Sequence, residues 1–102
     1  MDVQACQQDV ETWITAHGGY WDEFVTLARM SEELGEVSAA LQRLRGFRPR
    51  KVDVDLGAEV GDLFFILCSF ANQQGLSLAS CFEQTMAKIT TRDSQAWKDA
   101  QA

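Results

Sequence analysis

Apolar residues recur every three or four positions along most of the chain, which is the repeat of an amphipathic α-helix. The pattern breaks at glycines, and residues suited to capping a helix stand at the start of each new stretch. These breaks predict helices at about residues 2–17, 21–45, 55–74 and 78–92. We therefore expect an all-α, four-helix bundle-like fold in a single domain, residues 1–102, with a polar tail over 93–102.

The second and third helices carry the clearest apolar stripes, and we expect these two stripes to pack against each other. On the second helix the stripe is Leu27, Met30, Leu34, Val37, Leu41 and Leu44, and on the third it is Leu56, Val60, Leu63, Leu67 and Phe70. Phe64 and Ile66 widen the stripe of the third helix. One thin bundle cannot cover so wide an apolar surface, so we expect a homo-oligomer.

Two pairs of acidic residues follow the same spacing on these two helices. Glu33 and Glu36 on the second helix, and Glu59 and Asp62 on the third, are each three residues apart. At about 100° per residue, each pair falls at the same edge of its apolar stripe, at about −40° and −100°. If the helices pack antiparallel, the four carboxylates face one space, where a divalent cation relieves their repulsion.

Oxygen ligands favour Mg²⁺, or Mn²⁺, over zinc or copper. The only histidine, His17, cannot supply the Glu-x-x-His pairs of a di-iron bundle. The alternative is that the four acids belong to a solvated acidic surface. Two matched pairs that flank apolar stripes favour the metal site.

Charged residues are distributed unevenly along the chain. The formal net charge is −6, which argues against nucleic acid as the main partner. Five of the nine basic residues lie in one stretch: Arg43, Arg45, Arg48, Arg50 and Lys51. This basic loop either gathers phosphates or is a solvated run of charge.

The cysteines and the hydropathy of the chain indicate where in the cell the protein is expected. The chain has an odd number of cysteines, Cys6, Cys68 and Cys81, and no C-x-x-C pair. This is typical of free thiols in a reducing compartment. The N-terminus lacks the basic and apolar regions of a signal peptide. The most apolar run, residues 63–71, is too short to cross a bilayer. We expect a soluble, cytoplasmic protein with no membrane partner.

The acidic pairs belong to two motifs in a fixed order. They read Glu32-Glu33-Leu34-Gly35-Glu36 and Glu59-Val60-Gly61-Asp62. At these residues the sequence resembles the MazG nucleotide pyrophosphohydrolases, whose signature is E-E-x-x-E on one helix and E-x-x-D on the next. The resemblance covers about residues 13–92. It implies a MazG fold, assembled as a dimer or a dimer of dimers.

The resemblance also implies an activity. It is the Mg²⁺-dependent hydrolysis of (deoxy)nucleoside triphosphates between the α and β phosphates, which yields monophosphate and pyrophosphate, as in the cleansing of nucleotide pools. The implied metal ligands are Glu33, Glu36, Glu59 and Asp62. Glu32 or Glu33 is the implied catalytic carboxylate that positions or deprotonates the attacking water.

Substrate contacts are also implied by the resemblance. Family members hold phosphate with basic and polar residues of the last helix, and Lys88 and Arg92 stand four apart on one face there, without the usual Asn. Base-recognition residues precede the first motif, where Trp13, His17 and Trp21 are found. The alternatives are solvated charges on the last helix, and core packing or a helix-end contact for the aromatic residues.

Two other functions stay open. One is a non-catalytic helical module that binds nucleotide or a protein partner, which would tolerate the loss of a motif acid, although none is lost here. The other is a narrower enzyme of the same superfamily, such as a dUTPase-like protein or a phosphoribosyl-ATP pyrophosphohydrolase.

Overall fold

The structure is a computed structural model that describes residues 1–50 and 53–101. In this part of the chain every regular element is helical, so the predicted all-α fold is confirmed. The elements are α1 (Val3–Ala16), α2 (Glu23–Leu44), α3 (Leu56–Gln73), α4 (Leu78–Lys88), a π-helical segment (Ile89–Asp93) and α5 (Ser94–Ala100). Lys51, part of the predicted basic loop, lies outside the described residues.

Short polar side chains begin the first four helices. Asp2, Asp22, Asp55 and Ser77 each accept a hydrogen bond from a backbone N–H in the first turn, at 2.8, 2.9, 3.0 and 3.2 Å. Such caps satisfy donors that would otherwise lack a partner inside the helix. Gly18 and Gly75, which follow α1 and α3, have φ values of 103° and 68° that only glycine adopts without strain.

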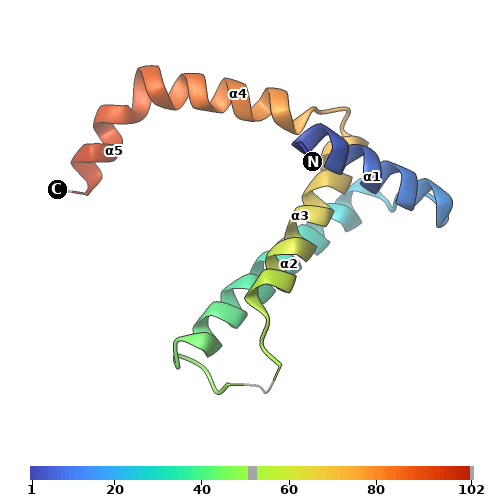
Figure 1. The fold of residues 1–102 in the computed structure, drawn as a ribbon, viewed down its shortest axis with the longest axis horizontal. Helices are drawn as coiled ribbons and strands as arrows, with labels where there is room; N and C mark the ends of the chain where they lie inside the picture. Colours follow the sequence, from blue (N-terminus) through green and yellow to red (C-terminus); the bar gives the residue numbers. More distant parts are fainter. Residues whose placement is uncertain (51–52, 102) are drawn as a thin grey trace.

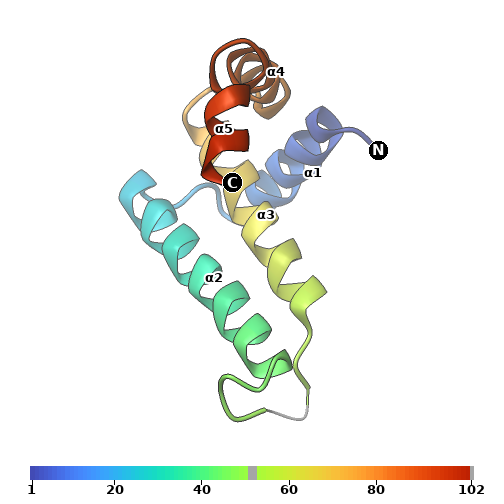
Figure 2. The ribbon, with the colours of Figure 1, turned by 90° about the vertical axis from the view of Figure 1, so that its left-hand side faces the viewer.

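The α2 and α3 helices run antiparallel, side by side, and the loop between them closes the far end of this pair (Figures 1 and 2). Small residues of α2, Ala39 and Ala40, are buried, and so is Ile66 of α3. The α1 helix crosses the other end of α3, where Val10 and Ile14 pack with the fully buried Cys68. This packing fixes the α2–α3 pair, which carries both acidic motifs.

The α4 helix, the π-helical segment and α5 form an arm that extends away from the α2–α3 pair (Figure 1). Gln7 of α1 holds the root of this arm: its side-chain amide donates to Asn72 and to the Leu76 carbonyl, both at 2.9 Å. Its side-chain oxygen accepts from the Leu78 N–H at 2.8 Å, in the first turn of α4. The buried Gln7 therefore sets the direction in which α4 leaves the fold.

A single chain leaves much of its apolar surface uncovered. Half of the stripe predicted for the second helix, Leu27, Leu34 and Leu41, is exposed, with Leu34 at 58%. The radius of gyration is 16.7 Å, whereas a compact domain of this length has one of about 13 Å. Contacts within one chain thus cover only part of the apolar stripe of α2.

Most of the predicted polar tail is helical, because Ser94–Ala100 forms α5. This segment contains helix-favouring Ala, Gln and Lys, and Gln95 donates to Asp99 one turn later at 2.9 Å. Local propensity forms this helix without an apolar stripe. The fourth helix also ends earlier than predicted, at Lys88, where the π-helical segment begins.

Within residues 1–50 and 53–101, no helix is both long enough and apolar enough to cross a membrane.

Candidate metal centre

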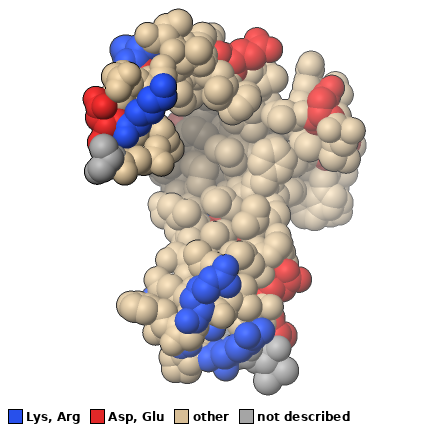
Figure 3. All heavy atoms as spheres, turned by 60° about the vertical axis from the view of Figure 1, so that its left-hand side comes forward, with Lys and Arg blue, Asp and Glu red and all other residues tan. Residues whose placement is uncertain are grey.

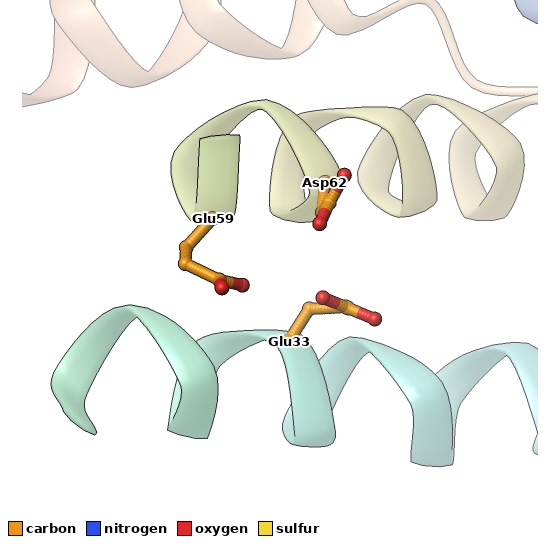
Figure 4. Close-up of side chains that lie close together, drawn as sticks. All are labelled: Glu33, Glu59 and Asp62. Carbon is orange, nitrogen blue, oxygen red and sulfur yellow. The ribbon is translucent and has the colours of Figure 1, made fainter. Parts of the chain in front are cut away.

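Three acidic side chains from two helices converge between α2 and α3. Glu33 of α2 and Glu59 and Asp62 of α3 each place a carboxylate oxygen within 4.8 Å of the other two (Figure 4). Glu33 and Glu59 are partly buried and Asp62 is exposed. The i, i+3 spacing puts Glu59 and Asp62 on one face of α3, and the antiparallel packing brings Glu33 opposite them.

These ligands fit a hard divalent cation. All the donors are carboxylate oxygens, which suit Mg²⁺ and Mn²⁺. Oxygens around one Mg²⁺, each at about 2.1 Å from it, lie within about 4 Å of each other. Small side-chain rotations are therefore enough to bring the three oxygens onto one ion, and the open side leaves room for water and phosphate oxygens.

The electrostatics of the cluster favour a bound cation. The pKa of Glu59 is raised above its usual value, first by desolvation and then by the negative charges around it, those of Glu36, Asp62, Glu33 and Asp55. A carboxyl group whose pKa is higher in the fold than in the unfolded chain destabilises the fold as pH rises above its ordinary pKa. A divalent cation removes this cost because it neutralises the repelling carboxylates.

The fourth predicted ligand, Glu36, does not join this group of oxygens. It lies one turn beyond Glu33 on α2 and lines an adjoining pocket with Glu59. Its charge is the largest single contribution of a neighbouring residue to the raised pKa of Glu59. Glu36 is therefore close to the cluster but stands at its edge.

Glu32 lies outside the group and is tied to an arginine. Arg29 approaches Glu32 at 3.4 Å and Glu33 at 3.6 Å, and its guanidinium stands 5.5 Å from the centre of the Trp21 ring. Arg29 thus connects the acidic cluster with the aromatic residues that precede α2. Arg29 was not among the predicted site residues, although its i, i+4 spacing from Glu33 predicts the ion pair.

The three predicted base-binding residues line one pocket of about 250 Å³. His17 stacks on Trp13 with ring centroids 4.1 Å apart, and Phe65 meets Trp13 edge to face at 5.8 Å. Trp21 and Tyr20 complete the aromatic wall. Burial, and then the hydrogen bond to Glu11, raise the pKa of Tyr20 to about 12, so its hydroxyl stays protonated at neutral pH.

The two predicted phosphate-binding residues lie on the arm. Lys88 ends α4, and Arg92 in the π-helical segment pairs with Asp93 at 2.9 Å. The arm points away from the α2–α3 pair (Figure 1), so one chain does not bring Lys88 and Arg92 to the acidic cluster.

One helical repeat joins the acidic cluster to the pockets beside it. The relevant residues follow alternating steps of three and four on one face of each helix. They are Arg29, Glu33, Glu36, Ala40 and Arg43 on α2, and the N-cap Asp55 followed by Glu59, Asp62, Ile66 and Ser69 on α3. Four acids of this repeat were predicted as site residues. Arg43 and Ile66 were noted for the basic loop and the apolar stripe, and their place in the repeat follows from the same spacing.

Comparison with known proteins shows the family of the chain. The family model of the MazG nucleotide pyrophosphohydrolase domain matches residues 23–97. The uncharacterized protein YpjD of Bacillus subtilis (strain 168) is 34% identical over 82 residues, which are 78% of this chain and 74% of YpjD.

Two solved structures are also similar. The crystal structure of the proposed pyrophosphatase YpjD from Bacillus subtilis superposes with a TM-score of 0.81 at 29% identity, over 89% of this chain and 97% of that one. The Bacillus-conserved MazG protein, a nucleotide pyrophosphohydrolase, superposes with a TM-score of 0.79 at 25% identity, over 93% and 96% of the two chains.

Together with these matches, the all-helical fold and its facing carboxylates place the chain among hydrolases that act on phosphoric anhydrides, a family that generally depends on a divalent metal. The chain belongs to the MazG nucleotide pyrophosphohydrolase family, and its activity is the hydrolysis of a nucleotide pyrophosphate bond.

Proposed function

We propose that the protein hydrolyses (deoxy)nucleoside triphosphates between the α and β phosphates, with Mg²⁺ as the natural ion and Mn²⁺ as a substitute. The observation that carries this proposal is the convergence of Glu33, Glu59 and Asp62 on one space between two helices. Phosphoryl transfer needs charge neutralisation and an aligned water more than it needs a protein nucleophile, and clustered carboxylates provide for both.

The five motif acids divide into metal ligands and a catalytic carboxylate in this proposal. Glu33, Glu59 and Asp62 hold the ion, and Glu36 completes the set when its side chain turns toward Glu59. When bound, the ion neutralises the phosphate oxygens and lowers the charge that builds up in the transition state. Glu32 or Glu33 accepts the proton of the attacking water. The water oxygen bonds to phosphorus as the bond to the bridging oxygen breaks, which releases monophosphate and pyrophosphate.

The aromatic pocket is the proposed nucleobase site. Trp13, His17 and Trp21 offer flat faces on which a base stacks, and the pocket volume of about 250 Å³ is of the size of a small ligand site. Phe65 and Ile66, which line the pocket, follow Asp62 by about one turn of α3. A base in this pocket therefore places its phosphates toward the acidic cluster.

Self-association is part of the proposal. The exposed stripe of α2 and the uncovered arm support a dimer or a tetramer in which a second copy covers these surfaces. In such an assembly, the arm of one copy would bring Lys88 of α4 and Arg92 of the π-helical segment to the phosphates bound by the other copy. We further propose that the enzyme works in the cytoplasm and removes unwanted nucleotides from the pool.

Product identification tests the function. Purified protein is incubated with each common ribo- and deoxyribonucleoside triphosphate and Mg²⁺, and the phosphate product is identified by ³¹P NMR. We expect pyrophosphate from at least one substrate, and no product with EDTA. We expect the rate to fall by at least about a hundredfold in Glu59→Ala. Release of orthophosphate would contradict cleavage at the α–β bond, and no turnover of any nucleotide would favour a binding module.

Narrower activities are outcomes of the same experiment. Turnover limited to dUTP would indicate a dUTPase-like enzyme. If the protein is inactive toward the common triphosphates and releases pyrophosphate from phosphoribosyl-ATP, it is a phosphoribosyl-ATP pyrophosphohydrolase.

A further inference from the structure

A second pocket opens between α2 and α3, on the opposite side of the acidic cluster from the aromatic residues. Its volume is about 210 Å³. The lining residues are Glu36, Ala40, Arg43, Asp53, Val54, Asp55 and Glu59. Because Glu59 belongs to both the metal cluster and this pocket, the two spaces adjoin.

Arg43 is the basic residue of this pocket among the described residues. It is partly buried and lies one and two turns beyond Ala40 and Glu36 on the same face of α2. Long side chains on a helix lean toward its N-terminus, so the guanidinium is directed back toward Glu36 and the metal cluster. In residues 1–50 and 53–101, no carboxylate lies within ion-pair distance of Arg43. Its hydrogen-bond donors are therefore available to a ligand.

The three spaces occur in one order along the α2–α3 pair. The aromatic pocket lies at the α1 end, the carboxylates lie in the middle, and Arg43 lies near the loop, where basic side chains gather (Figure 3). The rise along α2 from Glu33 in the acidic cluster to Arg43 is about 15 Å. The rise along α3 from Ser69 in the aromatic pocket to Glu59 in the cluster is also about 15 Å. A nucleoside triphosphate has the same order of parts, namely a base, the reacting phosphates and a terminal phosphate.

We propose that Arg43 binds the terminal phosphates of the substrate, and so holds the pyrophosphate leaving group and favours triphosphates over diphosphates. This inference rests on the proposed function, because it assigns a direction to the same substrate. The planar guanidinium donates two parallel hydrogen bonds to phosphate oxygens, and such charge-assisted pairs are among the strongest hydrogen bonds in proteins.

The acids of the pocket add a condition to this inference. Four carboxylates line the pocket together with this one guanidinium, so a bare phosphate would be repelled. The phosphate binds only together with the divalent cation that neutralises the acids. Inorganic pyrophosphate should therefore bind the protein in the presence of Mg²⁺ and should not bind in EDTA.

Isothermal titration calorimetry with inorganic pyrophosphate tests this contact directly. In Mg²⁺ we expect Arg43→Ala to weaken pyrophosphate binding by about ten- to one-hundredfold, the range for hydrogen bonds to charged groups. Arg43→Lys should retain part of the affinity. Arg45→Ala is the matched control, because it removes the same charge two positions along, on a different side of the chain, and it should change the affinity by less than about threefold.

A kinetic measurement tests whether Arg43 sets the preference for triphosphates over diphosphates. For the wild-type protein and each variant, kcat/KM is measured with a nucleoside triphosphate and with the matching diphosphate. Arg43→Ala should lower the preference for the triphosphate by about tenfold or more, whereas Arg45→Ala should leave it unchanged. Circular dichroism and Mg²⁺ titration of each variant show whether the fold and the metal site are intact.

The outcomes separate this inference from the function. If the wild-type protein hydrolyses triphosphates, and folded Arg43→Ala binds pyrophosphate as tightly and keeps the same preference, the role of Arg43 is overturned while the function stands. If Arg43→Ala loses affinity for Mg²⁺ itself, Arg43 supports the acids instead and the inference is overturned. If the wild-type protein turns over no nucleotide, the function falls and the calorimetry alone decides whether Arg43 holds pyrophosphate.

Discussion

The α2–α3 pair and the arm differ in how much of their apolar surface the chain itself covers. The pair packs its small residues together and is covered at one end by α1, which produces the buried residues Ala39, Ala40, Ile66 and Cys68. The arm contains no buried residue in α4, the π-helical segment or α5. Phe82 and Trp97 on the arm are 65% and 70% exposed.

This difference separates the part of the chain that carries the acidic cluster from the part that is suited to self-association. The carboxylates lie on the part of the chain that packs with itself, so one chain alone brings the three acids of the proposed metal site together. The arm presents large apolar side chains and the predicted phosphate-binding residues, and it has little to pack against in a single chain. We infer that the arm depends on association and the acidic cluster does not.

The largest effect is expected from a charge placed on the arm. Phe82→Glu should weaken self-association by at least about thirtyfold, because a large apolar side chain in the centre of an interface contributes about 2 kcal/mol or more. Light scattering coupled to size exclusion measures the mass over a range of concentrations. Gln84→Glu is the control, since it adds the same charge elsewhere on α4 and should leave the mass unchanged. Equal masses for all three proteins would contradict an interface on this face.

A smaller effect is expected at the junction of the two regions. Gln7→Ala removes three side-chain hydrogen bonds and leaves the Leu78 N–H and the Asn72 side chain short of partners. We expect the free energy of unfolding to fall by about 1–2 kcal/mol, as measured by urea denaturation. The exposed neighbour Gln8 is the control, and Gln8→Ala should cost less than about 0.5 kcal/mol. A loss of the same size in both variants would show that the network does not hold the arm.

Much of the fold followed from local sequence signals. Residues suited to capping stand at the breaks in the apolar repeat, and Asp2, Asp55 and Ser77 act as caps there, because a short polar side chain satisfies the free N–H groups of the next helix. The second helix begins at Glu23, two residues later than predicted, since Asp22 is its cap. The direction of the arm could not be predicted, because it depends on the contacts of Gln7 with residues more than sixty positions away.

The candidate site was predictable where helical spacing alone decides position. The spacing placed Glu33, Glu59 and Asp62 on facing edges, and the structure brings their oxygens together. Spacing placed Glu36 in the same set, but an extra turn along α2 leaves it at the edge of the cluster. The pocket around Arg43 could not be predicted, because it depends on how the residues before α3, Asp53 to Asp55, return alongside α2.

The most direct test of the central claim is whether the three carboxylates hold one divalent ion. The electron paramagnetic resonance signal of free aqueous Mn²⁺ is measured as protein is added at neutral pH. We predict that the wild-type protein removes this signal, that Mg²⁺ restores it by competition, and that Glu59→Gln and Asp62→Asn bind Mn²⁺ at least about tenfold more weakly, while Glu83→Gln on α4 binds it normally. A signal that the wild-type protein leaves unchanged, or equal binding by all four proteins, would contradict a metal centre between α2 and α3.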